Sequence, residues 1–153
     1  MANSLKEEAR VDYDWAKLGL TVFKDPDDAH INRIGYHLQQ SVERSLKAIL
    51  EHTGFDYRAV GHSISKAYRS VLNHAPHALS QESQDFIEEY ADTLTLWEKN
   101  GRYPTDYLFT LRKMIKICPC VGKLLEEADA FCSEDVKKET QGIKRTRPLD
   151  FSK

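Results

Sequence analysis

The clearest pattern along the chain is a run of apolar positions between residues 31 and 49, separated by three, four, four, four and three residues. This spacing places them on one face of an α-helix. Gly54 follows shortly afterwards, and glycine is a typical residue just past the C-terminus of a helix. The sequence therefore predicts a long amphipathic helix whose core face is made of Ile31, Ile34, Leu38, Val42, Leu46 and Ile49.

A helix is also predicted over residues 5–23, ending before Pro26 because the residue before a proline avoids the α region. Its apolar positions recur at helical spacing and include Tyr13, Trp15, Leu18 and Val22. We expect the large aromatic side chains of the chain to lie in the core. These are Trp15, Phe23, Phe86, Trp97, Phe109 and Phe131.

Two further helices are predicted in the middle of the chain. A short one is expected near residues 63–72. A longer one begins after Ser80, a plausible N-cap, and runs to about Lys99, where Asn100 and Gly101 close it. No stretch of convincing length alternates with the period of two that a strand needs.

A last long helix is predicted after Thr105, which can cap it. Pro119 lies inside the apolar pattern, so we expect a kink or a break there. The apolar positions step by three or four residues through Leu108, Leu111, Ile115, Cys118, Val121, Leu125 and Ala128. Four major helices with short connections predict an all-α, antiparallel up-and-down bundle of four to five helices.

The composition of the 153 residues fits one ordinary domain, with 41% hydrophobic and 30% charged residues and a net charge of −2. The charge is uneven: residues 137–153 hold six basic and two acidic residues. We therefore divide the chain into a bundle over residues 1–136 and a basic, flexible tail over 137–153. Such a tail can contact nucleic acid or an acidic partner, or be a solvated end.

Several classes of protein do not fit the sequence. There is no run long enough to span a membrane and no secretory h-region, and three cysteines do not make a disulfide framework, so a cytoplasmic protein is expected. Cys118 and Cys120 form one isolated pair, and His74 and His77 have no partner ligands at a readable spacing. With no glycine-rich phosphate loop either, we expect neither metal nor cofactor.

The predicted second helix carries a sequence, Gly35 to Leu50, that resembles the signature helix of the HEPN family (higher eukaryotes and prokaryotes nucleotide-binding domain). It has an aromatic residue, then Gln39-Gln40, then Glu43 and Lys47-Ala48. Three other segments resemble family elements in the right order. They are residues 12–16 (Asp-Tyr-Asp-Trp-Ala), 61–64 (Gly-His-Ser-Ile) and 101–104 (Gly-Arg-Tyr-Pro), so the resemblance covers roughly residues 10–130.

The resemblance implies a helical bundle that commonly forms homodimers. Some members are toxin-type, metal-independent ribonucleases that use an arginine followed four to six residues later by a histidine. Other members pair with a small nucleotidyltransferase, and others bind nucleotides or RNA without cleavage. This chain departs from the ribonuclease motif, because all six histidines lie at position 77 or earlier and none follows Arg102.

We therefore expect a nucleotide- or RNA-binding and interaction module rather than an enzyme, possessing no catalytic residue of its own. The alternative is a divergent ribonuclease of toxin type that uses Arg102 with a tyrosine such as Tyr107. Three Arg–His pairs elsewhere have a similar spacing, but we interpret them as coincidences. These are Arg33–His37, Arg58–His62 and Arg69–His74.

The best candidate for an anion site is Arg102 with Tyr103, which we expect directly before the N-terminus of the last helix, where free N–H groups attract negative charge. Lys47 and Gln40 are expected across a groove from it, with Glu43 and His62 nearby. Each has a structural alternative: Arg102–Tyr103 as a structural cap and stacking pair, Glu43–Lys47 as a surface ion pair, one of Gln39 and Gln40 facing water, and His62 as a polar residue with its hydrogen bonds satisfied. The apolar stripe of the last helix is the expected homodimer interface.

Overall fold

The structure is a computed structural model that describes residues 4–23, 27–102 and 111–145. These residues form five α-helices and one short 3-10 helix, with no strand among them. In chain order the elements are α1 (Leu5–Val22), α2 (Asp28–His52), η1 (Tyr57–Val60), α3 (Ile64–His74), α4 (Gln81–Arg102) and α5 (Leu111–Arg145). The all-α prediction is confirmed.

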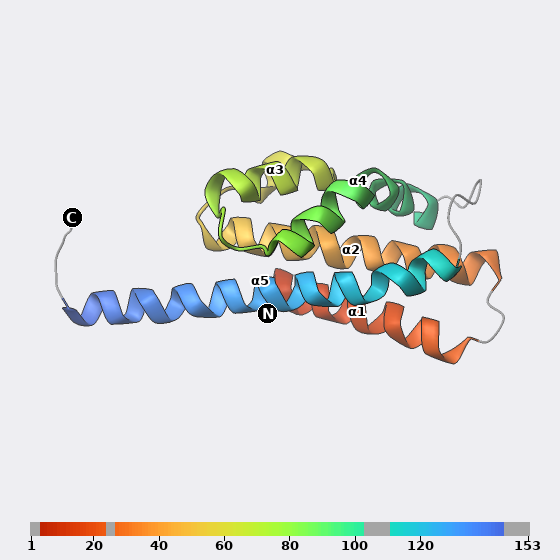
Figure 1. The fold of residues 1–153 in the computed structure, drawn as a ribbon, viewed down its shortest axis with the longest axis horizontal. Coiled ribbons are helices and arrows are strands. Elements are labelled where there is room, and N and C mark those ends of the chain that lie inside the picture. Colours follow the sequence, from red (N-terminus) through yellow and green to blue (C-terminus); the bar gives the residue numbers. More distant parts are fainter. Residues whose placement is uncertain (1–3, 24–26, 103–110, 146–153) are drawn as a thin grey trace.

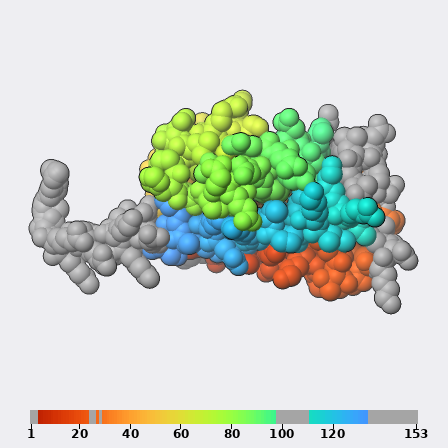
Figure 2. All heavy atoms as spheres, in the orientation of Figure 1, coloured from red at the N-terminus to blue at the C-terminus, as the bar shows by residue number. Residues whose placement is uncertain are grey.

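The long helices alternate in direction, and α2 lies at the centre of the bundle. Figure 1 shows α1 and α4 running one way and α2 and α5 the other. Helix α2 contacts every other element that the structure describes. Figure 2 shows α5 between α1 on one side and α3 with α4 on the other. This is the predicted antiparallel up-and-down bundle.

The predicted apolar face of α2 forms the middle of the core. All six of its residues, from Ile31 to Ile49, are buried. Trp97 from α4 and Leu124 from α5 are fully buried as well. On α5, the predicted stripe is buried from Cys118 onward, whereas Leu111 is partly buried, Ile115 is exposed, and Leu108 lies outside the described residues. Most of the surface that we expected to form a homodimer is therefore core.

Several predicted helix ends are confirmed by their caps. Gly54 has a φ of 88°, and its N–H donates to Glu51 O while that of Phe55 donates to Leu50 O, which is the Schellman arrangement. The Ser63 side chain accepts from Lys66 N, and the Ser80 side chain accepts from Ser83 N at 3.2 Å. The caps thus satisfy backbone groups that the helices leave unpaired.

Other boundaries differ from the prediction. Helix α4 does not stop at Asn100 and Gly101 but continues to Arg102, because one glycine disfavours a helix by only about 1 kcal/mol. Helix α5 is continuous through Pro119, so the prediction of a break there is wrong. It also continues through Arg145, into the segment that we assigned to a tail. Thr105 lies outside the described residues.

The apolar face of α1 is the main error of the prediction. Trp15, Leu18 and Val22 are each more than half exposed, and Phe23 is 40% exposed. The buried residues of α1 are instead the small Ala9, Ala16 and Gly19 together with Asp12.

These small residues bring α1 very close to α2. A Cβ atom on Gly19 would lie 2.9 Å from Ile34 Cγ1, and the Ser41 hydroxyl on α2 donates to Ala9 O at 2.9 Å. The close approach uses the side of α1 that carries the small residues, which leaves its large apolar side chains facing outward. Of the other aromatics, Phe86 and Trp97 are in the core, Phe131 is partly buried, and Phe109 lies outside the described residues.

Candidate functional site

Four polar residues of the signature helix are buried together on one side of α2. Gln39, Gln40, Glu43 and Lys47 are between 0% and 8% exposed. Residues 39, 43 and 47 are each four apart, so their side chains lie one above another along the helix. The interpretation of Glu43 and Lys47 as a surface pair is therefore wrong, and so is the expectation that one of the two glutamines faces water.

The buried residues form one hydrogen-bonded chain. Gln40 Nε2 donates to Gln39 Oε1 at 2.6 Å, and Gln39 Nε2 donates to Glu43 Oε1 at 2.8 Å. Lys47 Nζ donates to Glu43 Oε2 at 2.8 Å. His62 Nδ1 lies 3.1 Å from the same oxygen. Glu43 therefore holds three neighbours, and we call Gln39, Gln40, Glu43, Lys47 and His62 the signature cluster.

His62 connects the signature cluster to the surface. It follows Gly61, whose φ of 60° favours glycine, and precedes Ser63, the N-cap of α3. Its side chain is 61% exposed, so one ring edge contacts Glu43 while the rest faces solvent. The Lys47 ammonium also lies 5.9 Å from the centre of the Tyr57 ring. Two basic side chains and one aromatic ring therefore gather where η1 meets α3.

The structure brings together four of the six predicted site residues: Gln40, Glu43, Lys47 and His62. Arg102 is the last residue of α4 rather than a loop residue directly before α5, which begins at Leu111. Figure 1 shows that α4 ends toward the N-terminal end of α2, whereas Glu43 and Lys47 lie toward its C-terminal end. Tyr103 lies outside the described residues.

A second polar cluster joins α1 to α2, and sequence reasoning missed it. Asp12 is only 6% exposed, and its two oxygens accept from His37 Nδ1 at 2.8 Å and from Arg44 Nη1 at 2.5 Å. Glu8 lies 3.8 Å from Arg44 Nε. The available signal was that three of the four residues fall in segments that carry the family resemblance: Asp12 in residues 12–16, and His37 and Arg44 on the signature helix.

The described part of the chain can also be compared with the requirements of a metal site, a reactive thiol and a membrane span. Within residues 4–23, 27–102 and 111–145, no three His, Cys, Asp or Glu side chains are grouped so that they could hold a metal ion. Burial raises the pKa of the Cys118 and Cys120 thiols, which disfavours the reactive thiolate. None of the helices in this part of the chain is long and apolar enough to cross a membrane.

Comparison with known proteins places the chain in a family. The family model of the HEPN domain matches residues 3–131, which include α1 to α4 and the first part of α5. Neither the curated proteins nor the solved structures contain a match to the chain. Because the family model covers most of the chain, the protein belongs to the HEPN family.

Proposed function

We propose that the protein is a binding and interaction module that takes the phosphate of a nucleotide or RNA at the signature cluster. The observation that carries this proposal is the buried network centred on Glu43, with Lys47 and His62 at its outer edge. Glu43 holds both basic side chains in fixed positions before any ligand arrives. Donors that are already ordered lose less conformational entropy when they bind an anion.

The two basic residues have donors to offer. An ammonium has three N–H groups, and Lys47 uses one of them on Glu43. His62 contacts Glu43 through Nδ1, which leaves Nε2 on its exposed edge, where it is a donor in the imidazolium form of the ring. The Tyr57 ring beside Lys47 offers a face on which a base can stack.

Calorimetric titration with ATP and with a short single-stranded RNA tests the proposal. We expect Lys47→Met and His62→Gln each to weaken binding by about 1–3 kcal/mol, the range for charge-assisted hydrogen bonds. Affinity should also fall as salt rises. Lys123→Ala is the matched control, because Lys123 forms an exposed ion pair with Glu82 at 3.0 Å, outside the signature cluster. Unchanged affinity in both cluster variants would reject this site.

A substitution of Arg102 distinguishes a nucleotide ligand from a longer RNA ligand. Lys47 lies 19 positions after the first residue of α2, which is about 28 Å of helix. A mononucleotide on Lys47 cannot span the length of α2, whereas an RNA strand can. Arg102→Ala is expected to weaken RNA binding by about 1–3 kcal/mol and to leave ATP binding unchanged. If it weakens both equally, the ligand lies at Arg102 instead.

We propose no efficient ribonuclease activity, because no histidine follows Arg102 at the spacing of the ribonuclease motif. The pure protein should leave single-stranded RNA intact. Cleavage that disappears in Arg102→Ala would establish the alternative, a divergent toxin-type ribonuclease. For partners, we propose a homodimer and a second protein, for which the family suggests a nucleotidyltransferase.

A further inference from the structure

Helix α1 presents a continuous apolar stripe to solvent. Val11, Trp15, Leu18 and Val22 are between 49% and 58% exposed. They are spaced four, three and four residues apart, so they align over three turns, about 16 Å of helix. We call these four residues the α1 stripe. Contiguous exposed apolar surface of this kind marks interaction sites in soluble proteins.

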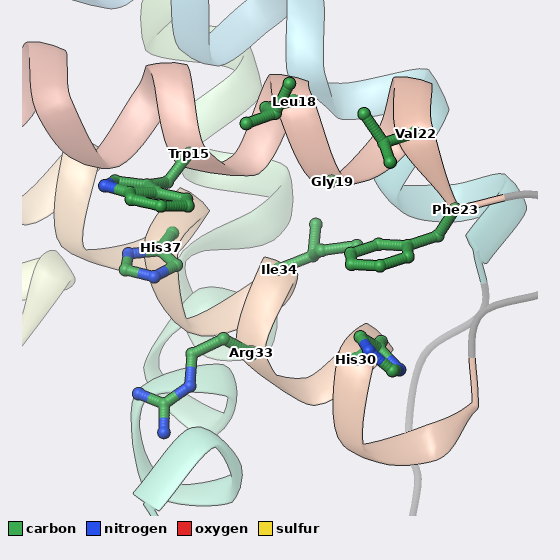
Figure 3. A pocket seen from close by; sticks show the side chains of 9 residues that line it. All are labelled: Trp15, Leu18, Gly19, Val22, Phe23, His30, Arg33, Ile34 and His37. Atoms are coloured by element: carbon green, nitrogen blue, oxygen red, sulfur yellow. The ribbon is translucent and has the colours of Figure 1, made fainter.

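A groove between α1 and α2 continues the α1 stripe. It has a volume of about 250 Å³, and Gly19 and Ile34 lie among the residues that line it. Figure 3 shows Trp15 of α1 facing His37 of α2, and Phe23 facing Ile34 and His30. The Trp15 and His37 rings are stacked with centres 6.4 Å apart, and the Phe23 and His30 centres are 4.3 Å apart. The stripe and the groove together make one docking surface.

The polar residues that line this groove are all basic. They are His30, Arg33 and His37 on α2, and none of the described residues that line it is an aspartate or a glutamate. Asp27 contacts Nδ1 of His30, and Asp12 contacts Nδ1 of His37. The Nε2 atom of each ring is left available. The guanidinium carbon of Arg33 lies 5.5 Å from the centre of the Tyr36 ring. Arg33 forms no ion pair with a carboxylate in the described part of the chain. The groove therefore combines an apolar floor with a rim on one side that holds two imidazole rings and the Arg33 guanidinium, which carries its formal positive charge.

We propose that this surface binds an amphipathic helix of another protein whose apolar face is flanked by acidic residues. The spacing of the α1 stripe matches the anchors of a helix lying in a groove. An acidic side chain on one flank of that helix would meet the Arg33 guanidinium, with His30 and His37 on either side of it. The surface uses other residues than the signature cluster, so the proposal does not depend on phosphate binding.

A second copy of the chain fits this surface less well. In a two-fold contact between antiparallel α1 helices, the same side of each molecule faces its copy. The basic rim of one protomer would then lie against the basic rim of the other, with Arg33 near its own equivalent. Like charges in such a contact oppose association.

The test uses two designed helical peptides of about 18 residues, with leucines spaced four, three and four apart. One has glutamates on a single flank, and the other has lysines at the same positions. Calorimetric titration should give at least tenfold tighter binding of the glutamate peptide. Leu18→Asp should reduce its affinity at least tenfold, whereas Ile115→Asp, a matched change of an exposed residue on α5, should not. Arg33→Glu should reverse the preference between the peptides.

Each other result overturns the proposal. Equal affinity for the two peptides would show that the rim does not select acidic partners. Absence of binding to either would show that the surface does not receive a helix. Self-association of the full chain in sedimentation that is lost in Leu18→Asp and kept in Ile115→Asp would assign the surface to a second copy. The effect of Lys47→Met on ATP binding tests the phosphate site alone and does not alter these outcomes. The two proposals can therefore fail separately.

Discussion

Removing the carboxylate of Glu43 tests whether the signature cluster is held by this one residue. In Glu43→Ala, Lys47 and Gln39 lose the oxygens that accept their hydrogen bonds, and both side chains are buried. His62 loses its contact too, but most of its side chain is in water. The change therefore leaves one charged and one neutral donor unsatisfied in the bundle.

The expected loss of stability follows from these contacts. Breaking a buried ion pair by removing one partner costs about 3–5 kcal/mol, and an unsatisfied buried donor costs about 1–3 kcal/mol. Lys47 has 11% of its side chain exposed, so its ammonium can turn toward water and recover part of this. We expect Glu43→Ala to lose about 3 kcal/mol, a large share of the 5–15 kcal/mol that is typical of a domain.

Two companion variants separate charge from packing. Glu43→Gln keeps the size of the side chain and one acceptor, so we expect a loss of about 1–2 kcal/mol. The double change Glu43→Met with Lys47→Met removes both charges. Because apolar residues often replace a buried ion pair at no loss of stability, the double variant should be more stable than Glu43→Ala.

Urea unfolding followed by far-ultraviolet circular dichroism measures these differences, provided the slope with denaturant is the same in all variants. Lys123→Ala is the control, because it breaks an exposed ion pair between α4 and α5 and should match the wild type. If Glu43→Ala unfolds at the same urea concentration as Lys123→Ala, the carboxylate does not hold the cluster, and the reasoning behind the proposed site is refuted.

Three further predictions concern the rest of the molecule. Gly19→Leu should lower the free energy of unfolding by about 1–3 kcal/mol in a urea titration, because even a Cβ there would lie 2.9 Å from Ile34 Cγ1; an unchanged midpoint would contradict the close helix contact. In native protein at neutral pH, a thiol reagent should modify half-buried Cys120 well before buried Cys118, as read by peptide mass mapping; equal rates would oppose this. Light scattering should give twice the 17.6 kDa of one chain, and a monomer mass at high concentration would exclude the homodimer.

The fold could be predicted because its helices carry strong local signals. The apolar period of α2 identified the core face residue by residue, and Gly54, Ser63 and Ser80 marked helix ends. The end of α4 could not be predicted as well, because one glycine is a weak stop signal and helix contacts elsewhere compensate for it. Periodicity also could not tell which side of α1 faces the bundle, since small residues lie opposite large ones.

The signature cluster was predicted in part. The resemblance identified Gln40, Glu43, Lys47 and His62, but the burial of the first three depends on helices that are distant in sequence. The contacts of Asp12 with His37 and Arg44 span 25 and 32 residues, and no local pattern encodes them. Pairings of this kind become visible only once two helices are docked.

The small residues on the inner side of α1 have a consequence for local unfolding. Ala9, Ala16 and Gly19 bury little apolar area, whereas α2 buries a full row of large side chains. Detaching α1 therefore exposes fewer large buried side chains of the helix itself than opening α2 does, and α1 should exchange its amide hydrogens at a lower free energy. A partner bound to the α1 stripe would add apolar contacts to this helix, so that occupancy of the surface would become readable as slower hydrogen exchange along α1.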